Sequence, residues 1–213
     1  MTPIHEIIET GALQVNCQLL GSQEQGEAIL IDPGGDAERL LKLLARLQLR
    51  LTHIINTHGH FDHIGAVAAL QERTGALFWI HEADRFLVES AADHAGSWGL
   101  PFGAIPRIDR TIQDQETLMV AGLQLEVIGT PGHTPGGVCL RWEEGIAVGD
   151  TLFAGSVGRT DLPGGNTGQL MASIRDRLLP LGDALVCHPG HGPSTTIGRE
   201  RRTNPYIRQG FDF

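Results

Sequence analysis

Three histidines and an aspartate are concentrated in one seven-residue stretch, 57–63, which reads Thr-His-Gly-His-Phe-Asp-His. An apolar, β-branched run at 52–56 precedes it, and a helical pattern follows from about Ile64. This order predicts a loop that leaves the carboxyl end of a strand. Open α/β sheets bind their ligands at such ends, so the stretch is a candidate site.

The spacing of these side chains favours metal binding. His58 and His60 are two residues apart, and in an extended loop such residues face the same way, towards one ion. Asp62 and His63 follow the turn and can reach a second ion. Imidazole suits zinc, iron or nickel, and a carboxylate suits oxygen chemistry. The alternative is a histidine-rich surface loop, but the full H-x-H-x-D-H order after a strand favours the metal site.

Three later residues occupy comparable positions. His133, Asp150 and His191 each lie in a glycine- or proline-rich loop directly after a predicted strand. Any one of them alone would more often be a structural polar residue. Four such loops in a chain of this size predict that they converge on one site.

The remaining elements must place these loops. Apolar runs predict strands at 4–8, 15–20, 28–31, 52–56, 77–80, 118–120, 123–128, 138–142, 146–148 and 184–187. Apolar residues at three-and-four spacing predict helices at 37–49, 64–73, 82–90 and 167–179. We expect Asp36 to cap the first helix, Ala121-Gly122 to form a tight hairpin turn and the tail after Ser194 to be helical. Strands followed by helices in each half suit two sheets packed face to face, with helices outside.

Residues 92–115 are rich in glycine and proline and predict a long loop. Trp98, Leu100 and Phe102 lie within it. Such residues can cover a site, but more often they pin a loop to the core, and we expect the second role.

Composition limits the class of protein. The chain has 213 residues, and its hydrophobic content of 41% is ordinary for a globular chain. Its net charge of −9 is unfavourable for nucleic-acid binding. The basic cluster Arg199, Arg201 and Arg202 is interpreted as a solvated helix face. We find no membrane-spanning run and no signal peptide. Three widely spaced cysteines fit reduced thiols, so we expect a cytoplasmic protein.

These motifs resemble the signature of the metallo-β-lactamase superfamily of binuclear metallohydrolases. The resemblance implies a four-layer αββα sandwich in which residues 1–213 form a single domain. It also implies two divalent metal ions, with zinc expected first and iron or manganese also fitting. In the family pattern, the ligands of the first ion are His58, His60 and His133, those of the second are Asp62, His63 and His191, and Asp150 bridges both ions.

An open coordination position distinguishes such a catalytic centre from a closed structural site. The resemblance implies a hydroxide held between the ions that attacks a carbonyl, with Asp62 as the catalytic residue that orients it. Asp32, in an Asp-Pro-Gly turn, matches a residue that holds the metal loop by hydrogen bonds. A turn-forming aspartate is the alternative for Asp32.

Within the superfamily, the chain looks most like the short, single-domain type II glyoxalases, which are hydroxyacylglutathione hydrolases. The similar motifs are 32–35, 131–136, 155–161, 189–192 and 203–206. The resemblance implies a thioesterase that cleaves S-lactoylglutathione or related acyl-glutathione thioesters. A bridging aspartate and the lack of an export signal make antibiotic hydrolysis an unexpected activity.

Arg159 matches a basic residue that contacts the substrate in these relatives, and a surface ion pair is the alternative. Longer glyoxalases bind glutathione with a C-terminal helical domain, and this sequence stops before one. How the chain would bind glutathione is therefore an open question at this point. The second candidate is a persulfide dioxygenase with one iron held by His58, His133 and Asp150. A non-catalytic, metal-stabilised interaction module ranks third. The sequence does not indicate an oligomeric state.

Overall fold

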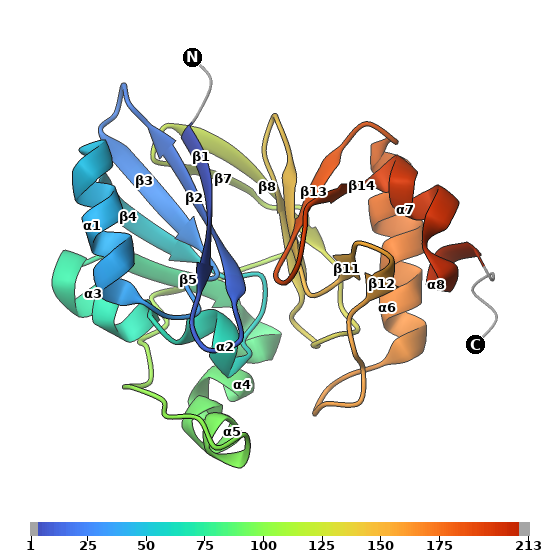
Figure 1. Cartoon of the computed structure of the whole chain (residues 1–213), viewed down its shortest axis with the longest axis horizontal. Coiled ribbons are helices and arrows are strands. Elements are labelled where there is room, and N and C mark those ends of the chain that lie inside the picture. Colours follow the sequence, from blue (N-terminus) through green and yellow to red (C-terminus); the bar gives the residue numbers. More distant parts are fainter. Residues whose placement is uncertain (1–3, 209–213) are drawn as a thin grey trace.

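The computed structural model describes residues 4–208. Two six-stranded sheets pack face to face, with α1 and α3 outside the first and α6 and α7 outside the second (Figure 1). The αββα sandwich expected from the sequence is therefore confirmed. Within the described residues, no helix combines the length and the apolar character needed to cross a membrane.

The first sheet has the order β1-β2-β3-β4-β5-β6. Its strands span Ile4–Thr10 (β1), Val15–Ser22 (β2), Glu27–Ile31 (β3), Arg50–Ile55 (β4), Leu77–His81 (β5) and Arg110–Ile112 (β6). The pairs β1–β2 and β2–β3 are antiparallel, and the pairs from β3 to β6 are parallel. Successive side chains of β3 point to opposite faces, and both faces are buried.

The second sheet has the order β14-β13-β10-β9-β8-β7. Its strands span Thr117–Val120 (β7), Leu123–Gly129 (β8), Val138–Arg141 (β9), Ile146–Gly149 (β10), Val186–Pro189 (β13) and Thr195–Thr196 (β14), and a separate hairpin joins Leu152–Phe153 (β11) to Ser156–Val157 (β12). The pair β10–β13 is parallel and the other pairs are antiparallel. Ala121 and Gly122 both have positive φ, as a two-residue hairpin turn between β7 and β8 requires.

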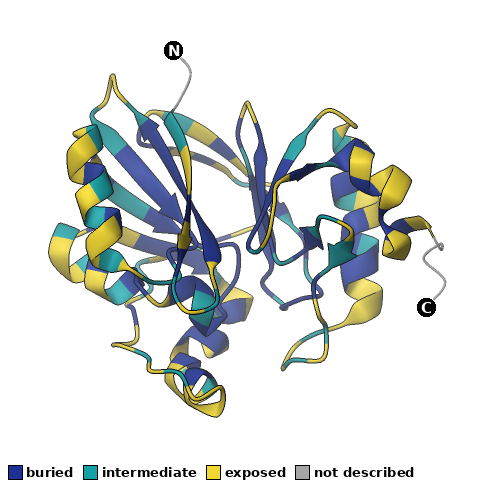
Figure 2. Ribbon diagram, viewed as in Figure 1, coloured by how far each residue is buried: buried dark blue, intermediate teal, exposed yellow. Residues whose placement is uncertain are grey.

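Three apolar layers hold the sandwich together. Leu30 of β3 packs with Leu40 and Leu44 of α1, whereas Ile29 and Ile31 on the other face of the same strand pack against the second sheet. A third cluster lies between the second sheet and the helices α6 and α7. Buried residues therefore fill both sheets, and exposed residues follow the outer helix faces (Figure 2).

The helices span Ala37–Leu47 (α1), Phe61–Ile64 (α2), Val67–Thr74 (α3), Arg85–Glu89 (α4), Ala91–Ser97 (α5), Thr167–Ser173 (α6), Ile197–Thr203 (α7) and Pro205–Arg208 (α8). A 3-10 turn, Glu82–Asp84, precedes α4, and a π-helical turn, Ile174–Leu178, extends α6. The predicted N-cap role of Asp36 is wrong. Its backbone is left-handed, with φ 56°, and its carboxylate accepts a hydrogen bond from Gly11 N instead of a helix N–H.

The predicted loop at 92–115 is also only partly correct. It contains α5 and the strand β6, which a three-residue pairing with β5 defines. Leu100 and Phe102 pack against the first core, as expected. Trp98 instead remains 50% exposed.

Candidate metal centre

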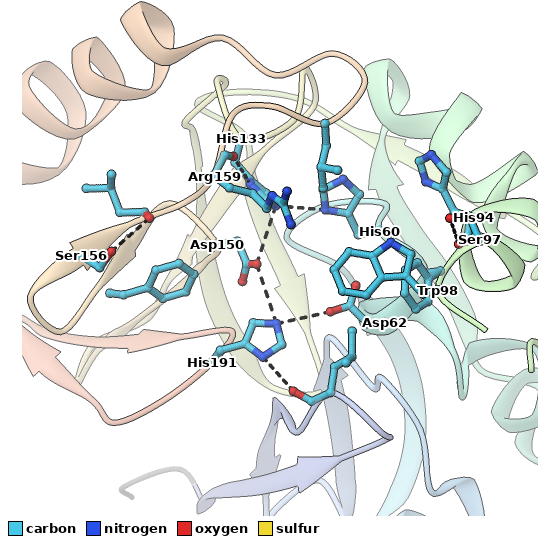
Figure 3. Close-up of a pocket in the computed structure, with 15 residues that line it drawn as sticks. His60, Asp62, His94, Ser97, Trp98, His133, Asp150, Ser156, Arg159 and His191 are labelled. Carbon is cyan, nitrogen blue, oxygen red and sulfur yellow. Dashed lines mark hydrogen bonds and ion pairs between the residues drawn. The ribbon is translucent and has the colours of Figure 1, made fainter. Parts of the chain in front are cut away.

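Four loops place the candidate ligands, and each loop follows a strand. The loop after β4 carries His58 and His60, and the loops after β8, β10 and β13 carry His133, Asp150 and His191. All four loops meet at one edge of the sandwich, where the labelled side chains face a common cavity (Figure 3). The strand-to-loop transitions therefore bring together residues that are more than a hundred positions apart in the chain.

The side chains form compact groups whose ligand atoms lie within 4.8 Å of one another. One group is His58, His60 and His133, and another is Asp62, His63 and His191. These are the two sets that the family resemblance assigns to the first and second ions. A third group, Asp32, His58 and His63, overlaps both histidine sets.

Asp150 lies between the two groups. Its carboxylate oxygens are 3.6 Å from His133 Nε2 on one side, and 3.5 Å from His63 Nε2 and 3.8 Å from His191 Nε2 on the other. One side chain thus reaches both groups, which is the position that a bridging carboxylate needs. The ligand roles themselves stay predictions.

Hydrogen bonds at Nδ1 fix the orientation of the histidines. His133 Nδ1 donates to Arg159 O at 2.7 Å, His191 Nδ1 donates to Leu13 O at 3.0 Å and His63 Nδ1 donates to an Asp32 carboxylate oxygen at 3.1 Å. Because carbonyl and carboxylate oxygens only accept, the Nδ1 atoms carry the protons. In the neutral rings, the Nε2 lone pairs therefore face the cluster, as metal ligation requires.

Unpartnered buried atoms show that the residues fit metal ions. Among the described residues, His58 Nε2, His63 Nε2 and Asp150 Oδ1 are buried and have no hydrogen-bond partner. Leaving such atoms unpaired costs about 1–3 kcal/mol each. Ligand atoms about 2.0–2.2 Å from a tetrahedral ion lie roughly 3.4 Å apart. The spacings between 3.3 and 3.8 Å around Asp62 and Asp150 match that geometry.

Burial and charge set the pKa values in opposite directions. Burial, followed by the charge of His133, lowers the pKa of His60 to about 3, which keeps this ring neutral and able to bind a metal. Burial also lowers the pKa of His63, but the carboxylates of Asp150 and Asp62 outweigh it and raise that pKa to about 10. The two carboxylates thus make this position favourable for positive charge.

Asp32 stabilises the loop after β4, which carries His58 and His60, by hydrogen bonds. It accepts hydrogen bonds from Thr57 N at 2.7 Å and from the Thr57 hydroxyl at 2.6 Å, in addition to the one from His63. It is buried, with φ 53°. These contacts tie the turn after β3 to the histidine loop.

Asp84, which our sequence analysis missed, connects two ligand loops. Its carboxylate accepts from Gly59 N at 2.9 Å, between His58 and His60, and from Gly136 N at 2.6 Å and the Thr134 hydroxyl at 2.8 Å, both beside His133. Burial raises its pKa, and these three hydrogen bonds oppose that effect. Its place after β5, at the same edge as the other ligand loops, was the available signal.

The β1–β2 hairpin holds the last ligand loop. Asn16 Nδ2 donates to Pro189 O at 3.0 Å and to Gly192 O at 2.7 Å, and its backbone N donates to Gly190 O at 2.7 Å. Together with the Leu13 carbonyl on His191, these bonds fix the loop from both sides.

A cavity of about 530 Å³ opens above the cluster, in the size range of small-molecule sites. Its lining includes His60, Asp62, His133, Asp150 and His191, together with residues outside the cluster: Leu13, Phe61, His94, Ser97, Trp98, Phe153, Ser156, Val157, Arg159 and Leu162. The Arg159 guanidinium makes a two-bond ion pair with Asp161 at 2.7 and 2.8 Å. The predicted ion pair is therefore present, and Arg159 also faces the cavity.

An αββα sandwich with two ligand groups at the edge between its sheets defines a metal-dependent enzyme of the metallohydrolase type. The metallo-beta-lactamase superfamily profile matches residues 10–191, and the chain belongs to this superfamily.

Individual relatives extend this assignment. The chain is 44% identical over 206 residues to hydroxyacylglutathione hydrolase GloC of Haemophilus influenzae, covering 95% of this chain and 97% of that protein. The crystal structure of BLEG-1, titled a B3 metallo-beta-lactamase, superposes with TM-score 0.90 at 37% identity and covers 96% and 99% of the two chains. TTHA1623 in a di-iron-bound form superposes with TM-score 0.85 at 40% identity, covering 97% and 100%. The resemblance inferred from the motifs is confirmed.

Proposed function

We propose that the protein is a single-domain, binuclear hydrolase that cleaves S-lactoylglutathione or related acyl-glutathione thioesters. The observation that carries the proposal is the pair of side-chain groups, with Asp150 between them, at the base of a cavity of small-molecule size. The relative named a hydroxyacylglutathione hydrolase, 44% identical over nearly the whole chain, supports the same substrate class.

The proposed ligands are those of the family pattern. His58, His60 and His133 would hold the first ion, and Asp62, His63 and His191 would hold the second. Asp150 would be a ligand of both ions. Zinc is our first choice, and iron or manganese also suits mixed imidazole and carboxylate ligands. The relative crystallised in a di-iron-bound form supports iron as an alternative.

When bound, two divalent ions supply a water acidic enough to ionise near neutral pH, together with positive charge for the carbonyl oxygen. The Asp62 carboxylate would accept a hydrogen bond from this water and so orient it. Burial raises the pKa of Asp62, but the charge of His63 and the hydrogen bond from His191 outweigh burial and lower it, so the carboxylate stays ionised. In the hydrolysis, a water oxygen would bond to the thioester carbon, the carbon–sulfur bond would break, and one water proton would pass to the sulfur, which would leave as a thiol.

Arg159 is the proposed contact for a carboxylate of the substrate. Its guanidinium is half exposed and already pairs with Asp161, so a substrate carboxylate would compete with that partner. If Arg159→Ala leaves the Michaelis constant for S-lactoylglutathione unchanged, this role is refuted.

The proposal places the protein in the cytoplasm with a small-molecule partner. Cys17, Cys139 and Cys187 are buried and unpaired, which suits a reducing compartment. The net charge of −9 disfavours nucleic acid as the substrate.

An anaerobic assay of purified, metal-quantified protein tests this function. We expect about two ions per chain and oxygen-independent cleavage of S-lactoylglutathione. About one iron per chain, with oxygen consumption on glutathione persulfide in a parallel aerobic assay, would establish the dioxygenase instead. A chromogenic β-lactam is assayed beside the thioester, because a structure 37% identical to this chain bears the metallo-beta-lactamase name. Turnover of the β-lactam without thioester cleavage would refute the proposal.

A further inference from the structure

Four apolar side chains line the cavity around Asp62 and His191, and we call them the apolar cup: Leu13, Phe61, Trp98 and Phe153. The Phe61 ring, next to Asp62 in the chain, packs on the Trp98 ring with centroids 6.1 Å apart. The Phe153 ring lies 6.5 Å from the His191 ring, and the Leu13 carbonyl accepts from the same histidine. The cup therefore surrounds Asp62 and His191, the ligands proposed for the second ion.

Positive charge lies near the first group of ligands. Among the described residues that line this cavity, Arg159 is the only arginine or lysine. Its carbonyl accepts the hydrogen bond of His133, which places it beside the first group of ligands. Figure 3 shows the same separation, with Trp98 beside Asp62 and Arg159 beside His133. The positive charge of the cavity thus lies near the first group of ligands, and the apolar cup lies around the second.

The apolar cup has room and unburied surface. The Trp98 side chain is 50% exposed, and a large aromatic that lines a cavity gains about 25 cal/mol per Å² when a ligand covers it. A second cavity of about 230 Å³ shares Leu13 and Phe61 with the first and continues to Leu100 and Phe102. The first cavity alone, at about 530 Å³, has room for an acyl group larger than a methyl group.

We infer that the apolar cup is the acyl subsite, and that it selects thioesters with a bulky aromatic or branched apolar acyl group. The inference rests on the proposed thioesterase function. Electrostatic complementarity sets the orientation, because the carboxylates of a glutathione thiol are drawn towards Arg159. The acyl half then points to the side of Asp62 and His191, where apolar contact provides selectivity.

Two thioesters with the same thiol test the subsite. S-mandeloylglutathione and S-lactoylglutathione share glutathione and a 2-hydroxyacyl carbonyl, and differ in phenyl against methyl. With metal-loaded protein, we expect kcat/KM to favour the mandeloyl substrate by roughly 10-fold or more. Trp98→Ala should lower this ratio about 5-fold or more, and Trp98→Phe should keep most of it. Tyr206→Ala removes another exposed aromatic side chain, which lines neither cavity, and should leave the ratio unchanged.

The outcomes separate subsite from function. If the native protein cleaves both thioesters, but Trp98→Ala lowers kcat/KM for both equally or for neither, the acyl subsite is overturned while the thioesterase function stands. If Trp98→Ala changes the preference for glutathione over a neutral thiol with the acyl group held constant, the orientation is wrong. If native protein cleaves neither thioester, the proposed function fails and the subsite with it. Metal content and melting temperature of each variant exclude a folding defect.

Discussion

Individual carboxylates decide whether the cluster can hold two ions, and Asp150 has the most demanding position. It approaches His63, His133 and His191 from between the two groups, and one of its oxygens is buried without a hydrogen-bond partner. We predict that Asp150→Ala lowers metal content below two ions per chain and reduces thioester kcat/KM by at least about 100-fold.

Metal analysis and steady-state kinetics on the same preparation check this prediction. Wild-type activity in Asp150→Ala would contradict the ligand assignment.

Asp84 is a second important carboxylate. It does not line the cavity but accepts hydrogen bonds from two of the ligand loops. An amide at this position cannot accept from Gly59 N, Gly136 N and Thr134 together, because one oxygen is replaced by a donor. We predict that Asp84→Asn lowers metal affinity or activity roughly 10–100-fold and costs about 1–3 kcal/mol of unfolding free energy.

Metal titration and thermal unfolding measure these two effects. Asp176→Asn, which alters an exposed aspartate paired with Arg175, is the matched control. An Asp84→Asn protein as stable and as tightly metallated as this control would show that Asp84 does not position the loops.

The sequence indicated the candidate ligands and Asp32, but it missed Asp84, which connects two ligand loops. His133, Asp150 and His191 stand out because each follows an apolar run and sits among glycine and proline. Asp84 also follows an apolar run, but no glycine or proline surrounds it, and its partners lie 25 and 52 positions away, so its contacts form only in the folded chain.

At the scale of elements, long periodic segments were predictable and short ones were not. The apolar spacing of α1 and the β-branched run of β4 identify these elements without tertiary contacts. Strands such as β6 and β11 have three and two residues and exist through pairing with a neighbour. Helix α5 escaped prediction because glycine and serine weaken its helical pattern.

The loop after β13 has almost no spare volume against its neighbours. A Cβ on Gly190 would overlap Asp150 Oδ1 and lie 2.6 Å from His63 Cε1. We predict that Gly190→Ala displaces this loop from the cluster, lowering metal occupancy and abolishing measurable thioester cleavage while the two sheets remain folded.

Circular dichroism and metal analysis distinguish local displacement from unfolding. The control is Gly96→Ala, because a Cβ at Gly96 meets nothing within 4 Å. Full metal occupancy in Gly190→Ala would show that the loop tolerates the added methyl group.

For the whole molecule, the cluster couples metal binding to folding, since its ligands come from both sheets and converge only in the native state. A ligand at 100 times its dissociation constant stabilises the native state by about 2.7 kcal/mol. For a chain of this size we predict that chelation lowers the melting temperature by roughly 5–10 °C.

Thermal scans with and without a chelator, and after zinc is restored, measure this coupling. Asp150→Ala is expected to show a smaller shift. An unchanged melting temperature in the native protein after verified metal removal would refute the coupling.

The hydrogen bonds from Asn16 to the loop around Gly190 join the first hairpin of the chain to one of its last strands. During synthesis, the histidines at 58–63 leave the ribosome well before His191 is made. A nascent chain can therefore fold its first sheet and display the early ligands, yet lack the partner loop that completes the second group. The second of the proposed ions can consequently find its full set of ligands only after translation of the final strands.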